Sequence, residues 1–546
     1  MRLNRIKIIQ FRNLKDFEIR FDDRFSSHAI IGQNGCGKSN LLEALIMIFR
    51  DLDLNQPAAL DYELDYTIRG YKVSIQALRG KRPNVQIDGQ KKSATHLHDH
   101  ARAYLPSHVF AYYSGKNARI ESLFEQHIRR FGRLMRSSDE EKVPRFGEFA
   151  LGDGTVFGPS GQDLLRRLFY CRGGHAQLVL LACLLSDDPV FKQILQDLNI
   201  ESLDSALFIL KQPHHLKTNL QEDDILQGDN RFWFARGTVV SEFLDKLWSL
   251  AVAPIDTTAQ ITVDFRGRTE KQEQIYLFLP DKEALKKLGD LVGSPEVFFR
   301  YAEGAYIGDL IDEVRITVKH RDAQGNICFD KLSEGELQLF TVLGLMRITS
   351  QDHCLFLLDE PDTHLNPIWK LRYFDDIERV IQPDSEAIIQ GDSNILITTH
   401  DPIMLGSLKK EQVHIMRRDQ KSIQVENPDA DPQGMGVAGL LKSEMFGLRS
   451  TVDSETLRRM DRRNALFAKG RQRNTDEDEE LTRLSAELSD LGFAADFRDP
   501  TYALFVRKMA QHTKFHKELL TPEEQREQNA IADKIIDEIL REERQA

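Results

Sequence analysis

Two short segments far apart in the chain carry the residue types that bind phosphate and magnesium. Residues 32–39 read GQNGCGKS, between an apolar strand pattern and an apolar helix pattern. The glycines let the backbone curl so that its N–H groups and a helix N-terminus point at a phosphate. We expect Lys38 to reach the β- and γ-phosphates and the Ser39 hydroxyl to bind Mg²⁺. The candidate nucleotide-binding residues here are Asn34, Gly35, Cys36, Gly37, Lys38, Ser39 and Asn40.

The second segment is an apolar run that ends in two carboxylates. Residues 354–358 read CLFLL, which is typical of a strand buried on both faces. Asp359 follows directly and is the expected Mg²⁺ partner of Ser39. Glu360 comes next and is the candidate base or water-positioning residue for hydrolysis. ATP and Mg²⁺ are therefore the predicted ligands.

Three further residues are assigned to the same site. Residues 395–399 form another short strand pattern, and His400 at its end is predicted to sense the γ-phosphate. Residues 3–22 alternate polar and apolar side chains and predict a hairpin that leads into the phosphate loop. Arg12 and Asn13 at its tip are candidates to approach the nucleotide, although a plain turn explains them nearly as well.

Residues 332–337, LSEGEL, resemble the signature sequence of ABC ATPases in its Ser-x-Gly-Glu form. Ser333 and Gly335 would open a helix whose amides are free to bind a γ-phosphate. In that family the signature completes the site of the opposite subunit. The resemblance therefore implies a head-to-tail pair that ATP joins and hydrolysis releases. An ordinary capped helix start is the alternative for these residues, and Asp362 is a further candidate to touch the partner head.

The order of these motifs predicts an α/β fold, namely an ABC/SMC-like P-loop ATPase head split by a largely helical insertion and followed by a helical C-terminal tail. Helical periodicity dominates residues 160–255, and no sustained heptad repeat indicates a long coiled coil. The predicted parts are a first lobe with the phosphate loop (1–150), a mostly helical insertion (151–310), a second lobe with the signature, carboxylates and His400 (311–425), and a helical region for partner or nucleic-acid contact (426–546).

Composition limits where the protein works and what it binds. The 546 residues carry a net charge of −12, so nucleic-acid binding would need a local basic patch or a partner. The most basic run contains the candidate contact residues Arg458, Arg459, Arg462 and Arg463. A solvated helix face paired with nearby acids is an equally good interpretation. Without an apolar stretch of membrane-spanning length or a signal-peptide core, we expect a cytoplasmic protein with no membrane contact.

Two clusters are candidate metal sites for a nuclease within this chain. Residues 96–100, HLHDH, would place alternating histidines on one face of a strand. No catalytic partner is evident near them, so a metal site there is not favoured. Asp429 and Asp431 have the spacing of a nuclease motif but lie between prolines, which indicates a loop. We therefore expect any nuclease activity in a partner.

Several segments together resemble the PtuA-type ATPases of Septu antiphage systems, which also occur in retrons. The likeness covers nearly the whole chain and rests on residues 8–14, 32–39, 112–115, 332–336, 359–367, 446–451 and 498–502. The resemblance implies an ATPase that holds an HNH nuclease of the PtuB type. In the retron-associated form, which is our first expectation, it also implies a reverse transcriptase and its RNA–DNA product as restraints.

Two other functions stay open at this point. One is a DNA-repair or recombination ATPase of the RecF/SMC-like class, and a neighbouring HNH gene would argue against it. The other is an OLD-like ATPase with its own cryptic nuclease. Plasmid cleavage by the purified protein that survives substitution of Asp359 would favour that alternative.

Overall fold

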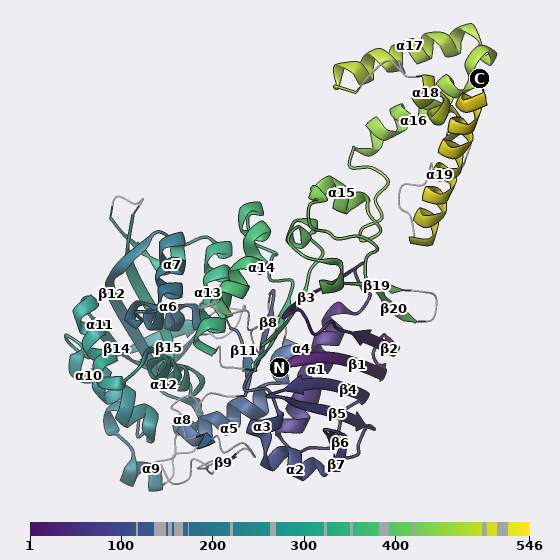
Figure 1. Cartoon of the computed structure of the whole chain (residues 1–546). Helices are drawn as coiled ribbons and strands as arrows, with labels where there is room; N and C mark the ends of the chain where they lie inside the picture. The colour runs from purple at the N-terminus through teal and green to yellow at the C-terminus, as the bar shows by residue number, and fades with distance from the viewer. Residues whose placement is uncertain are drawn as a thin grey trace. The chain divides into compact units, whose positions relative to one another are not determined.

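The structure is a computed structural model that describes most of the chain (Figure 1). Its contacts divide the chain into two units, residues 1–404 with 411–426, and residues 405–410 with 427–546. No helix in the described part is long and apolar enough to span a membrane. The described residues are 1–115, 118–135, 149–150, 156–157, 167–172, 174–218, 222–262, 269–321, 325–349, 353–381, 393–418, 422–493, 500–509 and 522–545.

A seven-stranded sheet forms the centre of the first unit, in the order β11-β8-β17-β18-β3-β19-β20. Neighbouring strands are parallel except for β20, which runs antiparallel to β19. All residues of β17 and β18 are buried, as expected for strands covered on both faces. The strands are β3 (Ser27–Gly32), β8 (Val109–Tyr113), β11 (Leu168–Tyr170), β17 (Leu355–Asp359), β18 (Asn394–Thr398), β19 (Val413–Arg418) and β20 (Ile423–Glu426).

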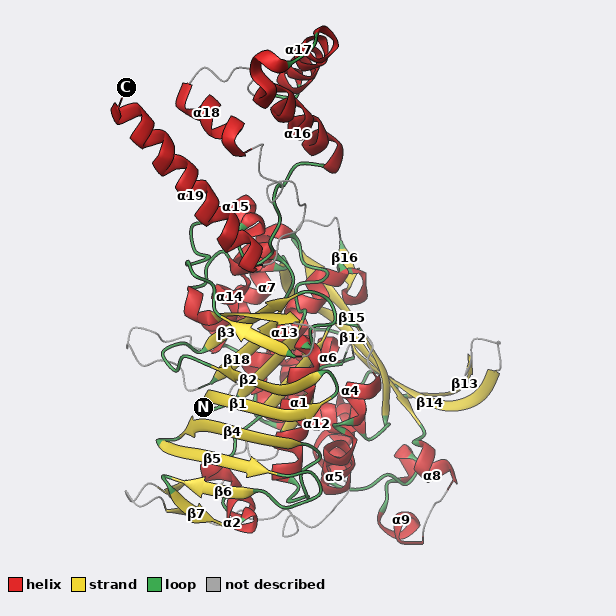
Figure 2. Cartoon of the chain, turned by 90° about the vertical axis from the view of Figure 1, so that its right-hand side faces the viewer, coloured by secondary structure: helices red, strands yellow, loops and turns green. Residues whose placement is uncertain are grey.

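A six-stranded antiparallel sheet lies beside it, in the order β2-β1-β4-β5-β6-β7 (Figure 2). Burial alternates along β4, so one face of this sheet packs inward and the other meets solvent. The predicted hairpin of residues 3–22 is its β1–β2 pair. The strands are β1 (Arg2–Phe11), β2 (Leu14–Arg20), β4 (Asp61–Ile68), β5 (Tyr71–Ala77), β6 (Asn84–Ile87) and β7 (Gln90–Lys92).

Helix α1 (Lys38–Asp53) fills the space between these two sheets. Apolar side chains such as Leu41, Leu45 and Phe49 are buried along it, and they share one core with Ile8 of β1 and Leu357 of β17. A helix buried on nearly every side cannot move without disturbing both sheets. The core therefore fixes the helix whose N-terminus carries the phosphate loop.

The insertion contains strands as well as helices, and three of them join two strands of the second lobe in a five-stranded sheet, in the order β13-β14-β12-β15-β16. Within residues 160–255, where helical periodicity dominates, the segment Ile200–Lys211 forms the strand β12 instead. Its buried residues Ile200, Leu203 and Ala206 recur every third position because β-bulges interrupt its pairing with β15. The other strands are β13 (Ile255–Thr262), β14 (Thr269–Leu279), β15 (Ile311–His320) and β16 (Asn326–Cys328).

Helices and two short strands complete the first unit. In its second lobe, α13 begins within the signature-like segment and α14 follows β17. The helices are α2 (Ala94–Asp99), α3 (Ala101–Tyr104), α4 (Ala118–Ser122), α5 (Glu125–Met135), α6 (His175–Leu185), α7 (Pro189–Asp197), α8 (His214–Thr218), α9 (Glu222–Gln227), α10 (Asp245–Leu250), α11 (Lys282–Val292), α12 (Pro295–Ile307), α13 (Glu334–Thr349) and α14 (Pro367–Ile381), and the strands are β9 (Phe149–Ala150) and β10 (Val156–Phe157).

The second unit is helical in its described part, as the sequence predicts for the tail. Helix α17 begins with a capping box between Asn474 and Glu477, and its buried Leu488 faces the unit's own core. The helices are α15 (Gly436–Lys442), α16 (Ser454–Lys469), α17 (Thr475–Asp490), α18 (Pro500–Met509) and α19 (Pro522–Gln545).

Candidate nucleotide site

The loop between β3 and α1 has the geometry of an anion cradle. Gly35 and Gly37 have φ of 81° and 98°, values that favour glycine. A side chain on Gly32 would place Cβ 2.3 Å from the Met416 carbonyl oxygen, so only glycine fits there. No side chain caps the N-terminus of α1, and no acidic residue lies in its first turn. Its amides therefore suit a negatively charged ligand.

The candidate binding residues of this loop differ in how they reach a ligand. The Lys38 ammonium donates a hydrogen bond to the Gly32 carbonyl at 2.8 Å, which holds it over the loop. The Cys36 side chain is buried, so only its backbone can face a phosphate. Asn34 and Gly35 are exposed. The loop thus offers a lysine and backbone amides, as the motif predicts.

Asp359 lies at the end of β17, and the fold brings it to Ser39. Its carboxylate accepts hydrogen bonds from the hydroxyls of Ser39 and Thr398. Burial raises the pKa of Asp359, while these two hydrogen bonds oppose the rise. A hydroxyl and a carboxylate side by side are the hard oxygen donors that Mg²⁺ prefers. The residues present therefore fit a magnesium ion.

Glu360 and His400 form a second pair at the same sheet edge. Glu360 has φ of 47°, and its amide donates to the Thr398 carbonyl at 3.0 Å. Its carboxylate lies 3.3 Å from Nδ1 of His400. The Glu360 side chain is 34% exposed and that of His400 is 57% exposed, so both can meet a ligand. This arrangement can orient a water molecule and take up its proton.

Two threonines to which the sequence assigned no role lie beside these pairs, and one of them, Thr398, contacts both. Thr398 bonds to Asp359 and to the Glu360 amide. Thr399 donates to Asp362 at 3.0 Å. Their place directly before His400 in the Thr-Thr-His motif was the available signal. They were missed because a strand-end threonine can equally well be a packing residue.

Asp362 differs from the expectation that it touches a partner head. Its side chain is 1% exposed and is held within the chain by Thr399. Burial raises the pKa of Asp362. The sequence shows a polar residue after a turn, and only the fold shows that the next strand covers it.

The signature-like segment does open a helix, but its N-terminus is capped by its own side chains. Glu336 accepts hydrogen bonds from the amide and hydroxyl of Ser333, at 2.8 and 2.7 Å, and the Glu336 amide bonds to the Ser333 hydroxyl. Gly335 is buried, and a Cβ there would lie 2.3 Å from the His364 carbonyl oxygen. The amides are therefore less free than predicted.

The basic run in α16 is neutralised by acids of α17. Arg459 lies 3.7 Å from Glu487, and Arg462 lies 2.6 Å from Glu480. Arg463 is 5% exposed, whereas Arg458 is exposed. Most of this candidate nucleic-acid surface thus matches the alternative interpretation, a helix face paired with acids.

The histidine cluster adopts a different structure from the one expected. Residues 96–100 belong to α2 and its C-cap rather than to a strand, because the Ser93 side chain caps the helix at the His96 amide. The rings of His96 and His100, one turn apart, lie 4.3 Å apart. Among the described residues, no group of three or more His, Cys, Asp or Glu side chains could hold a metal. Asp429 and Asp431 lie in a loop, as predicted.

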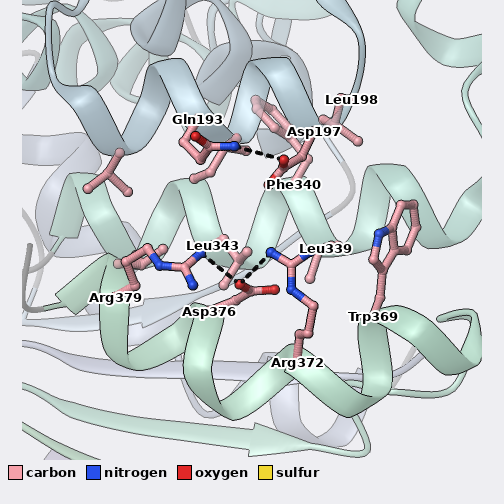
Figure 3. A pocket seen from close by; sticks show the side chains of 13 residues that line it. Gln193, Asp197, Leu198, Leu339, Phe340, Leu343, Trp369, Arg372, Asp376 and Arg379 are labelled. Atoms are coloured by element: carbon pink, nitrogen blue, oxygen red, sulfur yellow. Dashed lines mark hydrogen bonds and ion pairs between the residues drawn. The ribbon is translucent and has the colours of Figure 1, made fainter.

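A groove with a volume of about 210 Å³ lies between α7, α13 and α14 (Figure 3). Leu339 and Phe340 form part of its apolar floor. On its rim, Asp376 lies 3.1 Å from Arg379 and 3.5 Å from Arg372. None of the residues that line it belongs to the phosphate loop or to the carboxylate pair. The groove is therefore separate from the candidate nucleotide site.

Comparison with known proteins relates the chain to ATPases. Residues 1–103 match the family described as "AAA ATPase domain", and residues 205–405 match "AAA domain, putative AbiEii toxin, Type IV TA system". No curated protein matches this chain.

Residues 498–499, part of the tail that resembles PtuA-type ATPases, lie outside the described residues.

Solved structures similar to this chain include ATPase heads. The SMC head domain from Thermotoga maritima is 12% identical, with 79% of this chain and 100% of that chain covered and a TM-score of 0.31. The Smc head domain bound to the C-terminal domain of ScpA, from Pyrococcus furiosus, is 13% identical, with 78% and 96% covered and a TM-score of 0.32. The recombination mediator RecF bound to ATP is 14% identical, with 78% and 99% covered and a TM-score of 0.27. The two matched segments are each similar to AAA-type ATPase domains, and these matches support an ATPase.

Proposed function

We propose that this chain is the ATPase subunit of an antiphage defence complex, and that it binds and hydrolyses ATP at sites shared by two heads joined head to tail. The observation that carries the ATPase part is the convergence of Ser39, Asp359, Glu360 and His400 at the carboxyl edge of one parallel sheet. In open α/β sheets this edge is where ligands bind.

Each residue has a distinct role in this proposal. Lys38 and the loop amides bind the β- and γ-phosphates, and Ser39 and Asp359 hold Mg²⁺, which neutralises charge on those phosphates. Glu360 positions the attacking water and accepts its proton. His400, next to Glu360, contacts the γ-phosphate and links its presence to the orientation of the carboxylate.

The head-to-tail pair rests on the signature-like segment. Ser333 is exposed at the start of α13, and within one chain its hydroxyl and amide bond to Glu336 rather than to the phosphate loop. A helix N-terminus that faces outward suits a phosphate bound by a second copy. ATP would then join two heads, and hydrolysis would release them.

The defence role rests on the sequence resemblance to PtuA-type ATPases. The description of the family matched by residues 205–405 also names a toxin and a TA system. In this proposal the nuclease is a separate HNH protein of the PtuB type, and ATP controls its assembly or restraint. In the retron-associated form, a reverse transcriptase and its RNA–DNA product supply the restraint and bring nucleic acid to the complex.

The test is affinity purification of the tagged chain expressed together with its neighbouring genes, followed by mass spectrometry. An HNH nuclease that co-purifies, with or without a reverse transcriptase, supports the proposal. Recovery of the chain alone or with recombination proteins would contradict the defence role and favour a DNA-repair ATPase.

A further inference from the structure

The turn between β1 and β2 packs directly against the phosphate loop. The Asn13 side chain donates to the Gly35 carbonyl at 2.9 Å and accepts from the Asn40 side chain at 2.6 Å. A Cβ on Gly37 would lie 2.9 Å from the Asn13 oxygen, so the two segments are in close contact. A shift of this turn would therefore move the phosphate loop.

Arg12, at the tip of the same turn, reaches the first turns of α1. Its φ of 53° is unusual for a residue with a side chain, so contacts elsewhere must hold it. The guanidinium donates to Asn40 at 3.3 Å and to the carboxylate of Glu43, and it lies 5.1 Å from the centre of the Phe11 ring. A guanidinium has more N–H donors than these bonds use, so it can also meet a phosphate.

Glu43 connects this turn to a third segment. It lies one helical turn after Ser39, and its side chain is 2% exposed. One carboxylate oxygen binds Arg12, and the other lies 3.1 Å from Arg119 of α4. Burial raises the pKa of Glu43, and the two arginines oppose that rise. A buried carboxylate between two cations stays in place because leaving Arg12 costs a charge-assisted hydrogen bond and leaving Arg119 costs an ion pair.

We propose that Glu43 is a positioning residue for the nucleotide. By binding Arg12 and Arg119 together, it fixes the Arg12–Asn13 turn, and through that turn the phosphate loop, in the form that binds a nucleoside triphosphate. It also holds the Arg12 guanidinium beside the start of α1, where the phosphates lie. This inference rests on the proposed function, because it requires that the loop bind ATP.

The test measures binding of a fluorescent ATP analogue with Mg²⁺ to the full chain. Glu43→Gln keeps the shape of the side chain but removes its charge, and we expect binding about tenfold weaker. Glu18→Gln is the matched control, since Glu18 binds Arg5 at 3.0 Å between strands of the same lobe. We expect this variant to bind as the unmodified chain does. Equal binding by Glu43→Gln and the unmodified chain would overturn the proposal.

A double-mutant cycle distinguishes a positioning role of Glu43, exerted through Arg12, from a general structural role. If Glu43 acts through Arg12, then Glu43→Gln combined with Arg12→Gln binds no more weakly than Arg12→Gln alone. Losses that multiply would overturn the proposal, because Glu43 would then act independently of Arg12.

Two further variants keep the test decisive. Arg119 is 49% exposed, so Arg119→Gln is compatible with folding even if Glu43→Gln is not. We expect this variant to bind the ATP analogue about threefold more weakly. Unchanged binding would contradict the role given to the Glu43–Arg119 ion pair. If Lys38→Ala binds normally, the proposed ATP site itself fails. If Lys38→Ala loses binding and Glu43→Gln does not, only the role of Glu43 fails.

Discussion

The N-termini of α1 and α13 were both predicted to bind phosphate, but only that of α13 is capped by side chains. The N-terminus of α1 has no side-chain cap and no acidic residue in its first turn. The N-terminus of α13 has two glutamates in its first turn, and one of them, Glu336, closes a capping box with Ser333. A helix N-terminus attracts anions only while its amides are unsatisfied and its surroundings are not already negative. The amides at the α1 N-terminus are therefore available to a phosphate within one chain. At the α13 N-terminus, the capping box between Ser333 and Glu336 must first break.

Glu360→Gln has the largest expected effect, because it removes the proposed base for hydrolysis and leaves both helix N-termini unchanged. The amide can hold a water molecule but cannot accept its proton. We expect the rate of ATP hydrolysis to fall by about 10²–10⁴-fold, with ATP affinity retained. A phosphate-release assay and a binding titration on the same sample measure both quantities. Hydrolysis at the original rate would exclude Glu360 as the base.

Lys38→Ala tests phosphate binding at the α1 N-terminus. It removes the ammonium that lies over the loop, and we expect ATP affinity to fall about 100-fold, from roughly 3 kcal/mol of charge-assisted hydrogen bonding. Isothermal titration with ATP and Mg²⁺ provides the measurement. Normal affinity would mean that the α1 N-terminus is not the phosphate site.

Glu336→Ala opens the capping box at α13. If that box restrains the amides, ATP-dependent association of heads should strengthen about threefold, while the lost cap lowers stability by about 0.5–1 kcal/mol. Sedimentation at several protein concentrations measures the association.

The control for this prediction is Glu334→Ala. Glu334 lies in the same first turn, 3.5 Å from His364, and its loss removes an equal charge but leaves the box closed. Equal strengthening by both variants would show that charge alone, and not the box, distinguishes the two helices.

Asp359→Asn has the smallest expected effect on the fold and a defined pH dependence. Because burial raises the pKa of Asp359, the folded chain holds this proton more tightly than the unfolded chain does. That contribution stabilises the fold at low pH and is lost as pH rises through the raised pKa. We expect the variant to be more stable than the original at pH 8, with the difference shrinking toward pH 4.

Thermal unfolding across that pH range checks this prediction. A variant that is less stable at every pH would show that the hydrogen bonds from Ser39 and Thr398 outweigh the cost of burying the charge.

The parts of the site that were predictable from sequence are those set by local geometry. The phosphate loop and residues 354–360 combine a short motif with a strand pattern, so both their structure and their proximity follow from the fold class. The capping box was also readable, since Ser333 and Glu336 have the required spacing. The burial of Asp362 and the ion pairs of Glu43 with Arg12 and Arg119 were not predictable from sequence, because they join segments distant in the chain.

The insertion shows why the fold was only partly predictable. Periodicity assigns one period to a segment, and the β-bulges in β12 shifted its period from two toward three. Pairing with β14 and β15 decides the structure there, and those partners lie far along the chain. The helical tail was predictable because caps and apolar spacing in α16 and α17 are local signals.

In the proposed mechanism, the α1 site binds ATP within one chain and the α13 site completes it only in a second copy. The most direct test is the mass of the Glu360→Gln variant in solution, measured by light scattering with and without ATP and Mg²⁺. If ATP joins two heads, we expect a species of twice the mass, or a higher even multiple, and we expect it only with ATP. An unchanged mass in a sample shown to have bound ATP would contradict it.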